Sequence, residues 1–325
     1  MRGDVKGRAG AGRRAGVAAA VALFAVLGLA STALAQTTPW DELVIVAPTP
    51  LRGARIDADK LPGTTEILGK GDFARTGSLS ATDAFEQHAP GVSLADTQGN
   101  VFAKTLDFRG FEASPLQGAP QGLAVYMGGV RLNETFGDTV NFDLIPETAI
   151  DRADLFTSNP AFGLNALGGA INLGMKTGFT AKGLDASLEG GAFGRVYGSA
   201  EYGVTSGPWA AYAAIDGGHE TGWRLHSPST VGRLYGDLGW KRDRAELHLV
   251  ASIGDNTLGV IGPTPADMVE ADRRSVYTYP QATQNQSGLI ALNGGYDLGQ
   301  GWSLQGDVHG RGFNQSHMVG RRASR

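Results

Sequence analysis

The sequence predicts a mixed α+β domain followed by an antiparallel transmembrane β-barrel, of which about seven strands lie within the 325 residues. Three observations lead to this fold class. An export signal opens the chain, the region up to about residue 177 mixes helical and strand patterns, and a two-residue alternation of apolar and polar residues begins near residue 183. Beyond the signal, no apolar run is long enough for a spanning helix, so we expect any membrane contact to be made by strands.

The first 35 residues have the three parts of a secretory signal peptide. Residues 1–14 are rich in arginine and lysine, residues 15–30 are almost wholly apolar, and Ala33-Leu34-Ala35 supplies small residues for cleavage. An apolar run of about 15 residues is shorter than the ~20 that a membrane helix needs, which favours a cleaved signal over an anchor. We therefore expect the mature chain to start near Gln36.

Composition excludes several classes of protein. The chain has no cysteine, so disulfides, thiolate metal sites and cysteine nucleophiles are ruled out. A net charge of −4 argues against a nucleic-acid partner. There is no His-Glu-x-x-His pair, no Gly-x-Ser-x-Gly elbow and no phosphate loop, so we expect no enzyme activity, no catalytic residues, no metal site and no cofactor. A secreted hydrolase remains an alternative, although its nucleophile cannot be named.

Residues 60–177 show the local signals of a compact α+β domain. Ser80 precedes a short amphipathic helix that runs to His88 and stops at Pro90-Gly91, and the apolar face of this helix predicts that His88 is packed rather than a ligand. Leu123–Met127 and Val130–Leu132 flank Gly128-Gly129, which predicts a tight hairpin. Pro146 suits the first turn of another short helix over 147–152.

From residue 183 onward the pattern predicts seven strands of about ten residues, the length at which a tilted strand crosses a bilayer. Trp209, Trp240 and Trp302 fall at or near strand ends, where an aromatic girdle lies in a barrel. The predicted strands are 183–192, 195–205, 208–218, 231–241, 244–255, 286–298 and 301–314.

The connections between these strands support a membrane barrel. After the first tip, short turns alternate with longer loops at 219–230 and 256–285, as in outer-membrane barrels. A soluble β-sandwich also alternates polar and apolar residues and stays an alternative. Seven strands cannot close a barrel, because single-chain bacterial barrels have an even number of strands. We therefore interpret the sequence as the front part of a longer protein or as a truncated product.

Five short motifs in order give the chain a resemblance to a known family. They are DELVIVAPTP at 41–50, DAFEQHAPGVSL at 83–94, LDFRGF at 106–111, VYMGGVRL at 125–132 and FGLNALGGAINL at 162–173. With these motifs the chain resembles the N-terminal part of a TonB-dependent outer-membrane transporter. The resemblance implies a signal peptide (1–35), a TonB box and linker (36–59), a plug domain (60–177) and the first part of the transmembrane barrel (178–325).

The motif at 41–50 resembles the family's TonB box, which the inner-membrane protein TonB pulls. An extended strand can add to the edge of a partner's sheet through main-chain hydrogen bonds, and Pro48 and Pro50 would end that pairing. A flexible linker is the alternative, but linkers are usually richer in Gly and Ser than in Val and Ile. The implied TonB box comprises Asp41, Glu42, Leu43, Val44, Ile45, Val46 and Ala47.

The resemblance also implies where substrate binds and how the plug is held. Three loops of the plug, 97–104, 114–122 and 132–140, would face the substrate. Arg109, in the family's Arg-Gly-Phe strand, would hold the plug to acidic residues of the barrel. Ser158-Asn159-Pro160 stands where many members have Arg-Gly-Pro, so a second basic latch residue is missing. The implied substrate-binding residues are Gln98, Asn100, Gln117, Gln121, Asn133, Glu134, Phe136 and Asp138.

The function implied by the resemblance is active import across the outer membrane. The protein would bind a scarce nutrient, with a ferric siderophore or another metal chelate favoured by family frequency, and use energy transmitted by TonB. Its partners would be TonB with the inner-membrane energising complex, the chelate and outer-membrane lipid. A passive porin or adhesin-like barrel and a non-functional truncated receptor are the alternatives.

Overall fold

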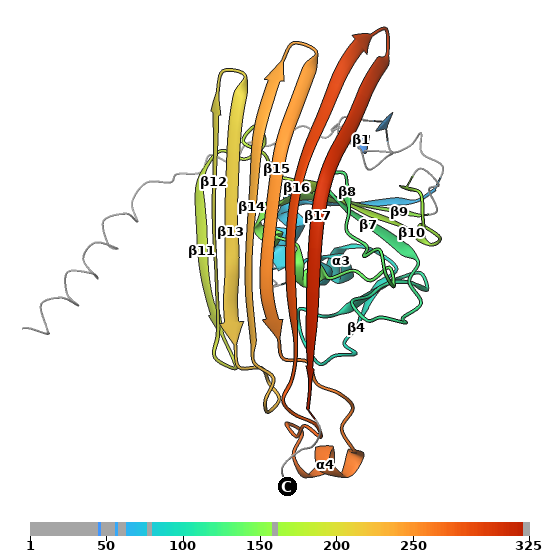
Figure 1. The fold of residues 1–325 in the computed structure, drawn as a ribbon, viewed down its shortest axis with the longest axis vertical. Helices are drawn as coiled ribbons and strands as arrows, with labels where there is room; N and C mark the ends of the chain where they lie inside the picture. The colour runs from blue at the N-terminus through green and yellow to red at the C-terminus, as the bar shows by residue number, and fades with distance from the viewer. Residues whose placement is uncertain (1–44, 47–55, 58–62, 77–79, 158–161, 321–325) are drawn as a thin grey trace, which may run out of the picture. The chain divides into compact units, whose positions relative to one another are not determined.

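The computed structural model describes residues 45–46, 56–57, 63–76, 80–157 and 162–320, all within the compact unit Val44–Arg325. These residues form an N-terminal domain, defined here as 63–176, and a sheet of seven strands, which we call the wall sheet (Figure 1). Within the described ranges, no helix is both long enough and apolar enough to span a membrane.

The centre of the N-terminal domain is a five-stranded sheet with the order β3-β9-β10-β7-β8. The pair β10–β7 is parallel and the other pairs are antiparallel. All five residues of β7 are buried, as expected for a strand covered on both faces. The strands are β3 (Thr65–Gly69), β7 (Leu123–Met127), β8 (Val130–Arg131), β9 (Ile150–Thr157) and β10 (Gly169–Met175).

Two helices and a smaller sheet complete this domain. Phe85 of helix α3 is fully buried and meets Phe73 of α2 edge to face, with ring centroids 6.1 Å apart. His88 at the end of α3 is half-buried, with Nε2 3.2 Å from Thr76 Oγ1, so its predicted packed role is confirmed. The elements are α2 (Lys70–Thr76), α3 (Ala81–His88), β4 (Val92–Ala95), β5 (Thr105–Phe108) and β6 (Phe111–Ala113).

The predicted hairpin is confirmed, whereas the predicted helix over 147–152 is wrong beyond residue 149. β7 and β8 pair across Gly128-Gly129, and both glycines have positive φ. Pro146 leads into a single 3-10 turn, η3 (Glu147–Ala149), which follows another such turn, η2 (Phe142–Leu144). From Ile150 the chain is extended, because β9 pairs with β3 on one side and β10 on the other. Those two ladders outweigh local helix propensity.

The wall sheet confirms the seven predicted strands and extends several of them. Each strand pairs antiparallel with the next in chain order, and Figure 1 shows them side by side. β16 and β17 are the longest, at 19 and 18 residues. The strands are β11 (Gly183–Gly191), β12 (Arg195–Ser206), β13 (Trp209–Glu220), β14 (Ser229–Arg242), β15 (Ala245–Leu258), β16 (Gln281–Gly299) and β17 (Trp302–Val319).

The two faces of the wall sheet differ in polarity, as the alternation predicts. Ile215, Leu234 and Ile253 lie on the outward face and are about half exposed, while Asp216, Arg233 and Asn256 lie on the inward face and are buried. The sheet therefore presents an apolar outer surface and covers its polar inner face with the N-terminal domain.

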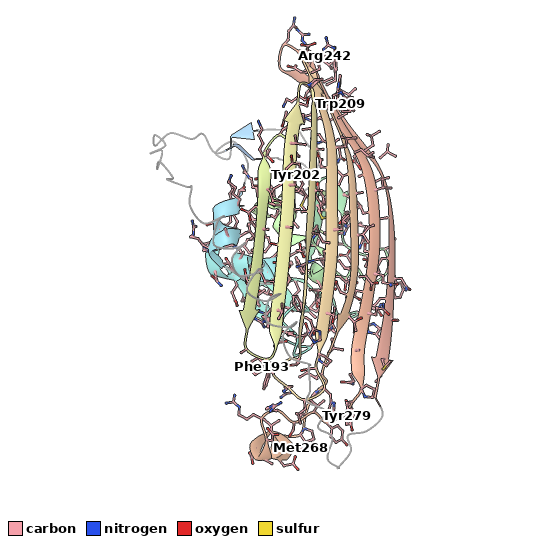
Figure 2. The ribbon with its side chains drawn as sticks, turned by 90° about the vertical axis from the view of Figure 1, so that its left-hand side faces the viewer. Phe193, Tyr202, Trp209, Arg242, Met268 and Tyr279 are labelled. Carbon is pink, nitrogen blue, oxygen red and sulfur yellow. The ribbon has the colours of Figure 1, made fainter. Side chains whose placement is uncertain are left out.

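The two ends of the wall sheet also differ. Figure 2 shows Arg242 and Trp209 at the end with short turns, and Phe193, Met268 and Tyr279 at the other end. That second end carries the longer loops 221–228 and 259–280, including helix α4 (Ala266–Ala271). Trp209 pairs with Trp240 near the short-turn end, and Trp302 begins β17 at that end, so the three tryptophans form one girdle there.

Before the N-terminal domain, two short strands pair with each other. β1 (Ile45–Val46) and β2 (Ile56–Asp57) are antiparallel, with Ile45 opposite Asp57 and Val46 opposite Ile56. The predicted signal peptide, and Asp41, Glu42, Leu43, Val44 and Ala47 of the predicted TonB box, lie outside the described residues.

Candidate functional site

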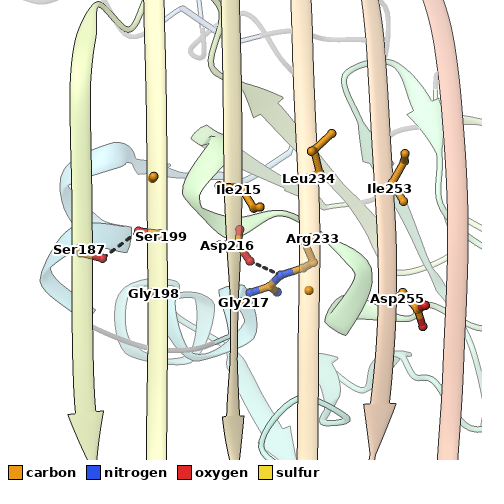
Figure 3. A pocket seen from close by; sticks show the side chains of 12 residues that line it. Ser187, Gly198, Ser199, Ile215, Asp216, Gly217, Arg233, Leu234, Ile253 and Asp255 are labelled. Carbon is orange, nitrogen blue, oxygen red and sulfur yellow. Dashed lines mark hydrogen bonds and ion pairs between the residues drawn. The ribbon is translucent and has the colours of Figure 1, made fainter.

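The polar contact between the N-terminal domain and the wall sheet is centred on Arg233. This residue occupies an inward position of β14, and its side chain is fully buried. The strand register places it directly opposite Asp216 of β13, and Arg233 Nε donates to Asp216 Oδ1 (Figure 3). Arg233 Nη2 also donates to the hydroxyl of Tyr197 on β12. Three strands of the wall sheet therefore fix the guanidinium.

The remaining nitrogen of Arg233 binds the N-terminal domain. Nη1 donates to the carbonyl of Ile145 at 2.9 Å and lies 3.3 Å from Glu147 Oε1. A longer contact, at 3.4 Å, reaches the carbonyl of Asp143. These acceptors lie on η2, on η3 and at the Ile145-Pro146 junction, where short 3-10 turns leave carbonyl groups without a hydrogen bond inside the turn itself. A rigid guanidinium fork is suited to bind them together.

Glu147 links this contact to helix α3. Its Oε1 accepts a hydrogen bond of 2.8 Å from the backbone N–H of Ala81, the first residue of the helix. Burial raises the pKa of Glu147 to about 8 although Arg233 acts in the opposite direction. This shift favours the protonated form of the Glu147 carboxyl group.

Two asparagines of the wall sheet hold Asp143. Asn256 Nδ2 on β15 donates to the carbonyl of Asp143 at 2.7 Å and to its Oδ2 at 3.0 Å, and Asn285 Nδ2 on β16 donates to the same Oδ2 at 3.0 Å. Burial raises the pKa of Asp143, against the effect of these hydrogen bonds. We call this group of residues the clasp: Asp143, Ile145, Glu147, Tyr197, Asp216, Arg233, Asn256 and Asn285.

Apolar packing surrounds the clasp. One continuous core contains Ile145 and Ala149 of the N-terminal domain together with Tyr212, Tyr235 and Val250 of the wall sheet. The clasp is therefore shielded from water, which strengthens each of its hydrogen bonds and makes the loss of a single partner costly.

Two further ion pairs cross the same boundary. Lys176, just after β10, binds Glu201 of β12 at 2.7 Å, and Glu201 also accepts a hydrogen bond of 2.6 Å from the Tyr212 hydroxyl. Arg311 of β17 pairs with Glu134 in the loop after β8. Burial raises the pKa of Glu134, and Arg311 opposes that shift.

Near the long-loop end, the loop between β4 and β5 is fixed to the wall sheet. Asn100 Nδ2 donates to Ser229 Oγ at 2.8 Å and to the carbonyl of Gly259 at 3.0 Å, and the carbonyl of Gln98 accepts from the N–H of Ile261. Gly99 has a φ of +62°, and a Cβ there would lie 2.3 Å from Ile261 Cγ1. The close approach of these loops therefore requires glycine.

Seven of the predicted substrate-binding residues fall into three groups. Gln121, Asn133 and Asp138 hold their own loops together: Gln121 bonds to the backbone of Ser114, Asn133 to that of Leu123 and Val125, and Asp138 to Arg131 and Asn165. Glu134 and Asn100 bind the wall sheet, as described above. The side chains of Gln117 and Phe136 are exposed, Phe136 by 80%.

The structure brings two of the three predicted loops together. The N–H of Val140 donates to the carbonyl of Ser114 at 2.9 Å, and Gly137 lies beside the side chain of Gln117. Gln117 and Phe136 therefore belong to one surface. The third loop, with Gln98 and Asn100, is held near the long-loop end of β14.

Arg109 occupies the tight turn between β5 and β6. Its φ is +55° and its side chain is exposed, with the guanidinium carbon 5.1 Å from the centre of the Phe108 ring. The predicted contact of Arg109 with barrel acids stays a prediction. Ser158-Asn159-Pro160 lies outside the described residues.

The outward face of the wall sheet carries a shallow groove of about 610 Å³ (Figure 3). Its floor is a row of glycines in register, Gly198, Gly217 and Gly232, and Ile215 and Leu234 border it. Asp216 and Arg233 of the clasp also line it, so the groove lies directly against the clasp.

Sequence reasoning missed the clasp although some of its residues follow a recognisable pattern. Asp216 and Arg233 occupy inward positions in predicted strands, where a polar residue suits a wet lumen equally well, whereas Asn256 and Asn285 fall in the predicted loop 256–285 and lie on β15 and β16 in the structure. Only the strand register shows that they are neighbours. The clasp binds the N-terminal domain to the wall sheet by hydrogen bonds. The described residues hold no group of three His, Asp or Glu side chains arranged for a metal ion.

Comparison with known families identifies the N-terminal domain. Residues 57–170 match the family model of the TonB-dependent receptor plug domain. No curated protein matches the chain.

Several solved structures share the fold. The ferric citrate transporter FecA in its unliganded form is 16% identical, with a TM-score of 0.72 over 86% of this chain and 44% of that chain. The pyoverdine receptor FpvA from Pseudomonas aeruginosa PAO1 is 13% identical, with a TM-score of 0.67 over 85% and 40%. The ferric-catecholate import receptor Fiu from E. coli K12 is 15% identical, with a TM-score of 0.64 over 83% and 41%. The chain thus spans less than half the length of each of these structures.

Proposed function

We infer the function from one premise: residues 57–170 are a TonB-dependent receptor plug domain, and the chain as a whole has the fold of the N-terminal region of such a receptor. We propose that the protein imports a scarce nutrient, a ferric siderophore or another metal chelate, across the outer membrane with energy supplied through TonB. From here the N-terminal domain is called the plug domain.

The clasp is the observation that carries this proposal. A passive pore needs an open lumen, whereas here four neighbouring strands, β13–β16, share an apolar core with the plug domain or bind it by hydrogen bonds. Contacts of this kind close the lumen until work is done on the plug. A pulling partner such as TonB would supply that work.

The wall sheet supports a location in the outer membrane. Its outward face is apolar over β12–β17, and Trp209, Trp240 and Trp302 lie at the short-turn end. We propose that the short turns face the periplasm and the loops 221–228 and 259–280 face the outside. β1, within the proposed TonB box, is an extended segment of the type that adds to a partner's sheet.

Substrate contact is proposed for the exposed part of the predicted set. Phe136 and Gln117 offer an aromatic face and an amide that are free to meet a chelate. Asn100, Gln121, Asn133 and Asp138 would shape the surface by holding its loops.

The test is transport of an iron chelate by the full-length receptor in the outer membrane of living cells. Val44→Pro removes a backbone donor from the proposed TonB box, so we expect energised uptake of radioactive iron to be abolished while chelate binding at the cell surface is retained. Val44→Ala is the matched control and should transport normally. Unchanged uptake by Val44→Pro would refute the TonB assignment, and uptake that persists after collapse of the proton gradient would indicate a passive porin.

A further inference from the structure

A chain of hydrogen bonds connects the inner surface of β17 to the clasp. His317 Nε2 lies 2.9 Å from Gln315 Oε1, Gln315 Nε2 donates to Asn285 Oδ1 at 2.8 Å, and Asn285 Nδ2 donates to Asp143 Oδ2 at 3.0 Å. His317 and Gln315 lie on the same face of β17 as Arg311, which contacts the plug domain. The chain therefore runs along the inner face, from an exposed imidazole to a buried carboxyl group.

The chemistry of the amides gives this chain one direction. An amide accepts through its oxygen and donates through its nitrogen, so turning the Gln315 or Asn285 amide by 180° would present the wrong atom to each of its neighbours. Asp143 Oδ2 takes the last N–H. At the other end His317 Nε2 must be the donor, because Gln315 Oε1 is an acceptor. Thr283 Oγ1, 2.9 Å from His317 Nδ1, fixes the other ring nitrogen.

Burial increases along this series of hydrogen bonds, from His317 to Asp143. His317 is exposed, Gln315 is half-buried, and Asn285 and Asp143 are each 2% exposed. The buried groups depend on their orientation, since a turned amide there would leave a donor or acceptor unpaired. A change at His317 therefore alters the hydrogen bond that Asn285 donates to Asp143. Asn256 also donates to the Asp143 carboxyl group.

We propose that His317 is a positioning residue for the clasp: by donating to Gln315 it orients the Gln315 and Asn285 amides that hold Asp143. A ligand oxygen that accepted the hydrogen bond from His317 Nε2 in place of Gln315 Oε1 would release Gln315 and loosen the 141–149 segment of the plug domain. Carboxylate, hydroxamate or phenolate oxygens have the required acceptor chemistry. Only this consequence for transport rests on the proposed function.

The experiment is hydrogen–deuterium exchange of the full-length receptor, monitored in peptides that cover 141–149, and it needs no substrate. His317→Ala and Gln315→Leu should each speed exchange about fivefold there, the effect of one hydrogen bond. The double variant should be no faster than Gln315→Leu alone, because both changes break the same chain. His317→Gln keeps a donor for Gln315 and should restore the parent rate.

A matched control distinguishes an effect carried by the hydrogen bonds from His317 to Asp143 from a general effect on β17. Gln305 lies on the same face of that strand, and its Nε2 contacts Ser303 of the same strand, so Gln305→Leu should leave exchange in 141–149 unchanged. The proposal is overturned if His317→Ala exchanges at the parent rate, or if the effects of the two single variants add. This assay does not measure transport. A failed uptake experiment would therefore contradict the proposed function but not the proposed role of His317.

Discussion

Replacing Arg233 by methionine tests whether the clasp holds the plug domain in place. Methionine fills most of the same volume and keeps the apolar stem, but it has no donors. The change removes the hydrogen bonds to the carbonyl of Ile145 and to Glu147, which join the two domains, and the bond to Asp216, which lies within the wall sheet.

The expected loss of docking free energy is worked out from the contacts of Arg233 that join the two domains. Removing one partner of a buried ion pair costs about 3–5 kcal/mol in total. Only the contacts that cross the boundary oppose undocking, and hydrogen bonds to a charged group contribute about 1.5–3 kcal/mol each. Since the Glu147 contact is long at 3.3 Å, we expect the docked state to lose about 3 kcal/mol, which raises the undocked fraction on the order of 10²-fold.

Residues 1–325 contain no cysteine, so this part of the receptor gives no background in a thiol-labelling assay. Ala149 is fully buried on η3, and η3 lies against β12 and β13. A single Ala149→Cys change in the full-length receptor gives a thiol that a maleimide reaches only when the plug domain moves away from the wall sheet. The labelling rate should rise on the order of 10²-fold in the Arg233→Met background. Arg242→Met is the matched control, because Arg242 is exposed at a short turn and should leave the rate unchanged.

Loss of Arg233 leaves Asp216 as an uncompensated buried charge, which could disturb the wall sheet itself. The double variant Arg233→Met with Asp216→Asn removes that charge and should still label rapidly. A labelling rate within twofold of the parent in both backgrounds would refute the clasp as the element that holds the plug domain.

Three other changes probe separate parts of the structure. Burial raises the pKa of Glu147 from 4.5 to about 8, so its stabilising contribution is complete below about pH 4.5, declines as the pH rises and is lost above about pH 8; thermal unfolding between pH 5 and 9 should show this decline, and Glu147→Gln should reduce the slope. Asn100→Ala removes two side-chain hydrogen bonds to β14 and the loop after β15, at about 1 kcal/mol each, so amide exchange at 259–261 should accelerate, and an unchanged rate would contradict the anchoring role. Phe136→Ala should weaken chelate binding without lowering the amount of folded receptor, because the ring is 80% exposed; equal affinity in a binding assay would remove it from the substrate site.

Local pattern was sufficient to predict most elements of the fold. Alternation located all seven strands of the wall sheet, and the Gly128-Gly129 signal located the β7–β8 hairpin. The error at 147–152 arose because Ile150 begins a strand with partners on both sides, and those partners are far away in the sequence. A propensity signal at Pro146 carries no information about such ladders.

The residues that join the two domains were harder to predict for a related reason. Asn100 has the residue type and loop position of a ligand contact. Its amide nitrogen instead donates to Ser229 and to the carbonyl of Gly259, which lie more than a hundred residues away in the sequence. Arg233 shows the opposite case, since a lumenal arginine is ordinary until the register sets Asp216 beside it and the fold brings Ile145 against it. Polar residues acquire these roles from long-range partners that periodicity does not specify.

The position of the clasp along the chain has a consequence for biogenesis. Every residue of the clasp lies between Asp143 and Asn285, so its contacts need only the plug domain and β12–β16. If the chain enters the membrane from its N-terminus, all residues of the clasp are present before β17 is added. The plug domain would then serve as the template on which β12–β16 assemble.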